Sequence, residues 1–147
     1  FSTNDWMEFR YAEILLNYAE AVVESGYTEN NAQQVAKDAL NATRRRAGHT
    51  VDIPLTLQNV LRERRVELAF ENKRWWDLIR RREFHEQFTN TIHKALCPVL
   101  DLRVSPPKYI FVRKYVIRGI PLTFDRRMYY SPIPGIGSND LIQNPQY

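Results

Sequence analysis

Three glutamates at four-residue spacing have the clearest potential for chemistry in this sequence of 147 residues. A helix would carry Glu63, Glu67 and Glu71 along one face. Two carboxyl groups in such an arrangement are what a glycoside hydrolase needs, one as the general acid and the other as the base or nucleophile. The arginines interspersed with them are Arg62, Arg64, Arg65 and Arg74. We therefore expect a ladder of ion pairs and hydrogen bonds that fixes the helix to its neighbours, and no catalysis.

The other reactive residue types are sparse. His85 and His93 lie eight residues apart, and the His-Glu pair that begins at His85 lacks the second histidine of an HExxH zinc site. His49 has no local carboxylate or cysteine companion. Cys97 has no basic helix start nearby to activate its thiol, and we interpret it as a small buried hydrophobic residue. Since the sequence contains no GxSxG elbow and no phosphate-binding glycine loop, we expect no catalytic residue, no metal site and no cofactor.

Two runs of three arginines offer a way of binding nucleic acid. Arg44–Arg46 and Arg80–Arg82 each lie at the end of a predicted helix, with aromatic residues nearby. Such clusters contact phosphate backbones in nucleic-acid-binding proteins. Cations at a helix end also complement the negative end of the helix dipole, which explains both runs without a ligand. Because the formal net charge of +4 is modest, we expect no nucleic-acid partner.

Tryptophan and tyrosine side chains offer faces on which a sugar ring can stack. Trp75 falls on an apolar helical stripe and is expected in the core, whereas Trp76 is expected to be partly exposed. Tyr129 and Tyr130 precede a proline-rich turn and offer a similar platform. The sequence does not select among these four residues, so we assign no ligand-binding residue.

The composition is that of a folded protein, with 44% apolar and 26% charged residues, and no apolar run is long enough for a transmembrane helix. Apolar periodicity predicts a mainly α fold that begins with a helical hairpin. The apolar face of its first helix, residues 5–25, consists of Tyr11, Leu15, Tyr18 and Val22. The second helix, residues 31–46, begins with a capping box of Asn31 and Gln34. Its apolar stripe consists of Ala32, Val35, Ala36, Ala39 and Leu40.

A long third helix is predicted for residues 56–82, with Thr56 as its N-cap. Its apolar face consists of Leu57, Leu61, Leu68, Trp75 and Ile79. Arg64 and Asn72 fall on the same face and need polar partners if they are buried. The interpretation depends on one continuous rod over residues 61–81 that packs on the hairpin and has its charges bonded to protein. A broken rod, or carboxylates gathered in an open cleft, would count against it.

The rest of the chain, residues 84–147, is predicted to form an irregular, loop-rich lobe, because all but one of the eight prolines lie there. A short β-strand or hairpin is its regular part, clearest from Tyr109 to Ile117, where large apolar residues alternate. The helical part of the chain is then residues 1–83.

Three separated motifs resemble the C-terminal region of the SusD/RagB family. RYAEILLNYAEAVVES at Arg10–Ser25 and ALNATRRRAG at Ala39–Gly48 are similar to its last tetratricopeptide-like helix pair. LRERRVELAFENKRWWDLIRR at Leu61–Arg81 resembles its ERRxELxFE core followed by RWxDL. YSPIP at Tyr130–Pro134 and QNPQY at Gln143–Tyr147 resemble its PIP turn and its terminal QNPGY, with a glutamine in place of the usual glycine.

This resemblance implies the C-terminal portion of a nutrient-binding outer-membrane lipoprotein, whose signal peptide, lipid anchor and remaining helices lie upstream. It implies that glycans or peptides are bound without catalysis at the cell surface and delivered to a TonB-dependent, SusC-like transporter. Within such a protein, this segment would be mainly scaffold. Two alternatives stay open at this point: a basic helical module that binds nucleic acid or protein, and a glycoside hydrolase that uses Glu67 and Glu71.

Overall fold

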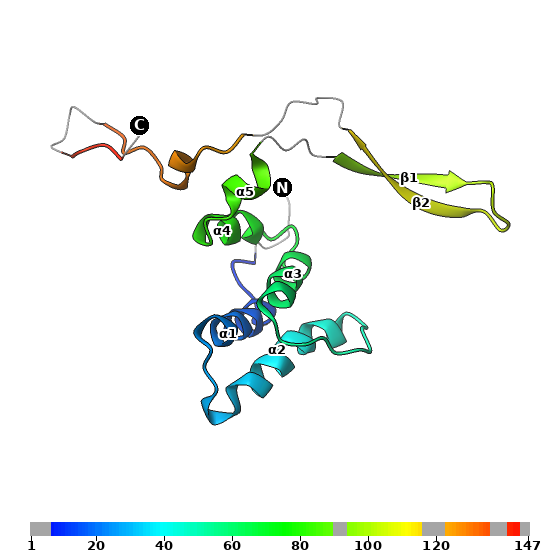
Figure 1. The fold of residues 1–147 in the computed structure, drawn as a ribbon, viewed down its shortest axis with the longest axis horizontal. Coiled ribbons are helices and arrows are strands. Elements are labelled where there is room, and N and C mark those ends of the chain that lie inside the picture. The colour runs from blue at the N-terminus through cyan, green and yellow to red at the C-terminus, as the bar shows by residue number, and fades with distance from the viewer. Residues whose placement is uncertain (1–6, 90–93, 116–122, 136–140, 145–147) are drawn as a thin grey trace. The chain divides into compact units, whose positions relative to one another are not determined.

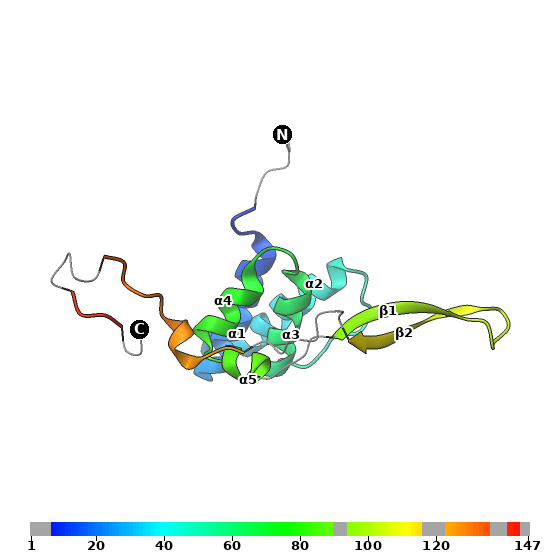
Figure 2. The ribbon, with the colours of Figure 1, turned by 90° about the horizontal axis from the view of Figure 1, so that it is seen from above.

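The computed structural model describes residues 7–89, 94–115, 123–135 and 141–144. Its contacts divide the chain into two compact units, Phe1–Asp77 and Leu78–Tyr147. Helices predominate, accompanied by a two-stranded antiparallel sheet, which confirms the predicted mainly α fold class (Figures 1 and 2). None of the helices in the described ranges combines the length and apolarity that a bilayer-spanning segment requires.

The first unit begins with the predicted helical hairpin, formed by α1 (Tyr11–Ser25) and α2 (Ala32–Arg46). A short 3-10 helix, η1 (Glu29–Asn31), precedes α2 directly. Gly26 ends α1 with a φ of 66°, and Gly48 follows α2 with a φ of 89°. These are left-handed conformations that glycine adopts without strain, so both predicted helix ends are confirmed.

The core of this unit lies between α1, α2 and α3 (Leu57–Glu67). It consists of small and medium-sized apolar side chains, namely Leu16, Ala19, Val22, Ala32, Ala36, Leu40 and Val60. The alanines let the helices of the hairpin approach closely, and the fully buried Leu16 and Leu40 fill the remaining space.

Several details of the predicted hairpin are wrong. α1 begins at Tyr11 rather than at residue 5, and Tyr11 and Tyr18 are exposed. Because α1 is apolar around most of its circumference, periodicity alone does not identify the stripe that its neighbours cover. In α2, Val35 is exposed as well. The capping box does not form: the Asn31 side chain makes no capping hydrogen bond, and its backbone is left-handed with a φ of 60°.

Asn41 attaches the connection between α2 and α3 to α2. Its side chain is fully buried, and its Nδ2 donates to the carbonyl oxygens of Lys37 at 2.9 Å and Ile53 at 3.1 Å. Its Oδ1 accepts a hydrogen bond from the Ile53 N–H at 2.9 Å. The amide group therefore pairs with both backbone groups of Ile53, which satisfies polar groups that would otherwise be buried without a partner.

The predicted helix of residues 56–82 is in fact two helices. Thr56 is the N-cap of α3, as predicted, because its Oγ1 accepts a hydrogen bond from the Asn59 N–H at 3.2 Å. α3 ends at Glu67, and α4 spans Lys73–Arg80. Between them, Phe70 and Asn72 adopt left-handed conformations with φ of 67° and 59°. The prediction of one continuous rod is therefore wrong.

Burial of Arg64 gives the break its physical reason. Arg64 Nη2 lies 3.0 Å from Asp77 Oδ1, although the two residues are 13 positions apart in sequence. In a continuous helix this separation would place them about 20 Å apart. The chain must fold back between α3 and α4 if the buried guanidinium is to reach this carboxylate. Apolar periodicity does not reveal such a turn, since the apolar spacing continues on both sides of it.

The second unit has a small aromatic core, to which α5 (Phe84–Phe88) and η2 (Arg126–Tyr129) contribute. The Phe84 ring stacks on Phe88 and Phe124, with ring centroids 4.5 and 4.4 Å apart. Phe84 and Phe124 are buried together with Leu78. The part of the chain predicted to be irregular thus contains two short helices, α5 and η2.

A β-hairpin is the other regular part of the second unit. β1 (Lys94–Asp101) pairs with β2 (Lys108–Tyr115) in antiparallel register. The predicted strand from Tyr109 is confirmed as far as β2 extends, while its last predicted residue, Ile117, lies outside the described residues. Exposed apolar side chains occur on both faces of this ribbon, namely Leu96, Val99, Leu100, Tyr109, Phe111 and Val112.

The PIP and QNP motifs contact each other through Gln143. Its side-chain Oε1 accepts a hydrogen bond from the Ile133 N–H at 2.8 Å, and its Nε2 donates to the Ile133 carbonyl oxygen at 3.2 Å. The Asn144 N–H also donates to Gln143 Oε1, at 2.9 Å. The Gln143 side chain thus pairs with both backbone groups of Ile133, as a neighbouring strand would, and Ile133 itself lies between two prolines.

Candidate functional site

The predicted carboxylate ladder forms, and the glutamates bind arginines from other elements. Arg10, just before α1, contacts Glu67 through Nη1 at 2.7 Å. It binds both oxygens of Glu71 through Nε at 2.9 Å and Nη2 at 2.7 Å. Arg46, at the end of α2, donates to both oxygens of Glu67 at 2.8 and 2.9 Å. Glu67 therefore connects the ends of three helices.

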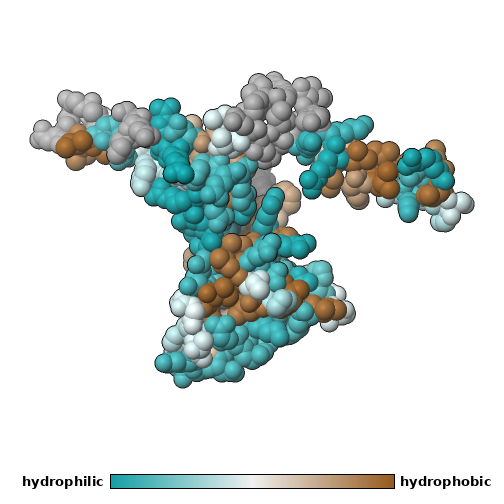
Figure 3. Space-filling view, in the orientation of Figure 1, coloured by the Kyte–Doolittle hydropathy of each residue, from teal (hydrophilic) through white to brown (hydrophobic). Residues whose placement is uncertain are grey.

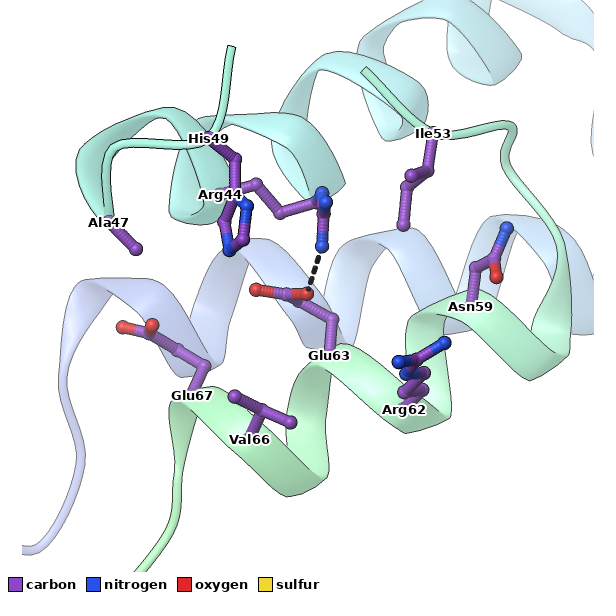
Figure 4. A pocket seen from close by; sticks show the side chains of 9 residues that line it. All are labelled: Arg44, Ala47, His49, Ile53, Asn59, Arg62, Glu63, Val66 and Glu67. Carbon is purple, nitrogen blue, oxygen red and sulfur yellow. Dashed lines mark hydrogen bonds and ion pairs between the residues drawn. The ribbon is translucent and has the colours of Figure 1, made fainter. Parts of the chain in front are cut away.

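Glu63 makes the third connection of this kind. Arg44 Nη1 lies 3.1 Å from Glu63 Oε2, and Figure 4 shows this ion pair at the wall of a pocket of about 340 Å³. Arg62 and His49 also line the pocket. The sequence missed that Arg10, Arg44 and Arg46 are the partners, because these residues are close to the glutamates in space but not along the chain.

Ionised arginines determine the protonation of the ladder. Burial acts to raise the pKa of Glu67, but hydrogen bonds from Arg10 and Arg46 outweigh it and hold this pKa below its usual value. The hydrogen bond to Glu71 is the largest of the effects that raise the pKa of Arg10. A glycosidase acid requires the opposite, a carboxyl group whose pKa is raised so that it stays protonated. The geometry gives Glu67 a structural role.

The lowered pKa of Glu67 predicts a loss of stability in acid. Such a carboxylate stabilises the fold above its unfolded pKa of about 4.3, and this contribution is lost as the pH falls through the folded pKa. We expect the free energy of unfolding of the Glu67→Gln variant to fall less between about pH 5 and pH 3 than that of the wild type. Urea denaturation at each pH measures the difference, with the exposed Glu29→Gln as the control. Parallel pH profiles for Glu67→Gln and the wild type would refute the prediction.

Arg64 is the centre of a second, more deeply buried cluster of charges. Its side chain is 4% exposed and binds Asp77 with two hydrogen bonds, at 3.2 Å from Nε and 3.0 Å from Nη2. Glu20 Oε2 lies 3.5 Å from Nε, and Nη1 donates to Asn17 Oδ1. The expectation that a buried Arg64 needs polar partners is confirmed, and the cluster joins α1, α3 and α4.

The arginine run at the end of α2 is occupied by contacts within the protein. Arg44 binds Glu63, Arg46 binds Glu67, and Arg45 binds Asp52, with Nε 3.0 Å from Oδ1. The hydrogen bond from Arg45 also lowers the pKa of Asp52. These ion pairs and the position at the helix end explain the run without a nucleic-acid backbone.

The tryptophans of α4 are both exposed. Trp75 is 46% exposed and Trp76 is 59% exposed. The prediction that Trp75 packs in the core is wrong, because the turn before α4 rotates that helix so that Asp77 and Leu78 are buried instead. The expectation of an exposed Trp76 is confirmed.

The predicted tyrosine platform is part of a pocket of about 380 Å³ in the second unit. Tyr129 and Tyr130 line it together with Arg82, which ends the second arginine run. The guanidinium carbon of Arg82 lies 4.9 Å from the centre of the Tyr129 ring and 4.7 Å from that of Tyr130. Three other residues complete the lining: His85, Glu86 and Arg126. The sequence did not reveal this pocket, since its two halves are more than forty residues apart.

Among the described residues, the remaining candidates do not come together in a site. Cys97 lies in β1 and is half-buried, so its interpretation as a buried residue is wrong. His93 lies outside the described residues. No three or more His, Cys, Asp or Glu side chains come together as a metal site in the part of the chain that the structure describes.

The chain resembles known proteins along its whole length. The family model described as "SusD family" matches residues 1–147. A SusD-like protein, P2, of Formosa agariphila is 34% identical in an alignment of 95 residues that covers 59% of this chain and 19% of that protein. Surface glycan-binding protein A from Bacteroides thetaiotaomicron superposes with a TM-score of 0.63 and 28% identity, over 97% of this chain and 25% of that one. The structure of BT4246 gives a TM-score of 0.70 and 30% identity, over 99% and 24%. These matches thus cover 19–25% of the length of these proteins.

Proposed function

The chain belongs to the SusD family, and from this premise we propose that it is part of a protein that binds glycans at the cell surface without cleaving them. The observation that carries the proposal is the superposition of 97% of this chain on a solved surface glycan-binding protein, at 28% identity. Peptides are the other ligand class that the sequence left open, and no contact in the structure favours them.

The state of the glutamates supports binding without catalysis. Glu63, Glu67 and Glu71 each form an ion pair with an arginine, at 3.1, 2.7 and 2.7 Å. These bonds use the carboxylate oxygens that a substrate or an attacking water would have to reach. We therefore propose that the ladder stabilises the helices and takes no part in a reaction.

We propose further that these residues are the C-terminal, mainly scaffolding portion of a larger protein. The chain covers 24–25% of the solved structures that it matches. Its first unit also presents apolar surface, part of which is visible in brown in Figure 3. Its exposed large apolar or aromatic side chains include Tyr11, Ile14, Tyr18 and Phe70. Monomeric proteins rarely leave so many large apolar side chains in water, so this surface fits packing against further helices of the same protein.

Two finer features of the proposal concern the whole protein. We propose that it is lipid-anchored at the outer face of the outer membrane and passes its ligand to a SusC-like, TonB-dependent transporter. Purification of the tagged complete protein from detergent-solubilised outer membranes tests the second feature. We expect such a transporter to copurify in near-equal amount, and its absence from membranes that contain it would overturn this part of the proposal.

Affinity electrophoresis of the complete protein tests glycan binding itself. Gels that contain different polysaccharides are compared with a gel that contains none, and a non-binding protein of similar size serves as the control. We expect at least one polysaccharide to retard the protein specifically. Unretarded migration in every polysaccharide gel, or binding of peptides alone, would show that the proposal is wrong.

A further inference from the structure

Arg82 occupies a position where glycine is the favoured residue. It follows α4 with a φ of 57°, and its N–H donates to the Ile79 carbonyl oxygen at 3.1 Å. The Glu83 N–H donates to the Leu78 carbonyl oxygen at 3.0 Å, which completes a Schellman motif. A residue with a Cβ atom is strained in this left-handed conformation. Because glycine would make the same turn at lower cost, the side chain of Arg82 is the feature that requires an explanation.

The Arg82 side chain is held against two tyrosines. Its guanidinium lies over both rings, and Nη2 donates to Tyr130 Oη at 2.8 Å. Tyr129 is fixed in turn, because its Oη accepts a hydrogen bond from the His85 N–H at 3.1 Å. Its ring also meets Phe124 edge to face, at 4.9 Å between centroids. This wall of the pocket is therefore built on the aromatic core of the second unit and is ordered before a ligand arrives.

Arg126, which also lines the pocket, contacts the imidazole of His85. Its Nη2 lies 3.1 Å from His85 Nε2. A guanidinium donates hydrogen bonds and accepts none, so Nε2 must be the acceptor and the imidazole proton is on Nδ1. Nδ1 lies 2.6 Å from Tyr129 Oη, which accepts that proton's hydrogen bond. Among the described residues, neither Arg82 nor Arg126 forms an ion pair with a carboxylate, and the acidic residue in the pocket lining is Glu86.

We propose that this tyrosine–arginine pocket binds an anionic sugar residue of a glycan, one that carries a carboxylate or a sulfate ester; the inference rests on the glycan binding proposed above. Planar guanidinium groups match the paired oxygens of both anions. The ring of Tyr130, which is 52% exposed, offers an apolar face beside them for the sugar ring. A volume of about 380 Å³ is within the range of small-ligand sites and accommodates a sugar residue.

Isothermal titration calorimetry of the complete protein tests the inference. The probes are an oligogalacturonide, a sulfated galactan oligosaccharide and a neutral galactan oligosaccharide of the same length. We expect one or both anionic probes to bind at least tenfold more tightly than the neutral probe. Added NaCl should weaken that binding, since the interaction is ionic. Preference for the first or the second probe identifies the anion as carboxylate or sulfate.

Two substitutions assign the binding to this pocket. Arg126→Ala removes one charge from an exposed position, and we expect it to weaken anionic binding about tenfold or more. Arg82→Gly removes the other charge while it retains the backbone turn, and we expect a similar loss. Arg113→Ala, an exposed arginine of β2, is the matched control and should bind like the wild type. Circular dichroism establishes that each variant is folded.

The outcomes separate this inference from the proposed function. If the complete protein binds the neutral probe as well as the anionic ones, or if Arg126→Ala and Arg82→Gly bind like Arg113→Ala, the pocket is not an anionic-sugar site. Glycan binding itself would survive that result. If no glycan binds in calorimetry or in affinity gels, the proposed function fails together with the inference.

Discussion

Replacing Arg64 with alanine is expected to lower the free energy of unfolding by about 3–5 kcal/mol. The guanidinium neutralises Asp77 and Glu20, which are 5% and 6% exposed. Without it, two buried carboxylates lose the guanidinium that binds them, and the cost of removing their charges from water is less well offset. The turn between α3 and α4 would also lose the contact that brings its two ends together. Urea denaturation followed by circular dichroism measures the loss.

Arg65→Ala is the matched control for this prediction. Arg65 is the next residue of the same helix and is exposed, so its removal should change the free energy of unfolding by no more than about 0.5 kcal/mol. Arg64→Lys adds a second comparison, because lysine retains the charge but cannot form the two-point contact with Asp77. A destabilisation by Arg64→Ala no larger than that by Arg65→Ala would contradict the buried cluster.

Replacing Leu40 with alanine is expected to cost about 2–5 kcal/mol of unfolding free energy. Leu40 is fully buried where the core side chains of α1, α2 and α3 meet. Its truncation removes apolar contacts and leaves a cavity that three helices cannot easily close. The same denaturation experiment measures the change.

Val35→Ala tests whether the structure identifies the correct face of α2. The sequence pattern places Val35 and Leu40 on one stripe, but Val35 is 47% exposed. Since alanine is also the better helix former, Val35→Ala should cost less than about 0.5 kcal/mol. Equal costs for the two substitutions would show that the predicted stripe, and not the observed core, is right.

The parts of the fold that local chemistry specifies could be predicted from the sequence. Gly26 and Gly48 mark helix ends because left-handed backbone favours glycine, and Thr56 marks a helix start because its hydroxyl accepts from a free N–H. The alternation of large apolar residues from Tyr109 likewise predicts β2. Each of these signals depends on a few consecutive residues.

The features that the sequence could not reveal depend on residues far apart along the chain. The break between α3 and α4 follows from the contact of Arg64 with Asp77, and the exposure of Trp75 follows from that break. The contacts within the candidate sites also join residues that are far apart along the chain. The glutamates could be predicted to form ion pairs, but their bond to Arg10 spans 57 residues for Glu67 and 61 residues for Glu71.

The predicted continuous rod does not exist, but its absence does not overturn the interpretation that the charged residues of this region stabilise the fold. That interpretation required the charges of residues 61–81 to be bonded to protein. Arg64 and Glu67 satisfy this requirement. Because the chain turns between Glu67 and Asp77, Arg64 binds Asp77 while Glu67 binds Arg10. Glu63 and Glu67 line the pocket of about 340 Å³, but an arginine binds each of them there. The three glutamates connect α3 and the turn after it to other elements through arginine.

Release of reducing ends is the most direct test of the central claim that this chain takes part in binding and not in cleavage. The complete protein is incubated with the glycan that retards it most in affinity gels, and new reducing ends are measured over time. The account predicts none above a blank without protein, for the wild type and for Glu67→Gln and Glu71→Gln alike. Release by the wild type that is lost in either variant would contradict it.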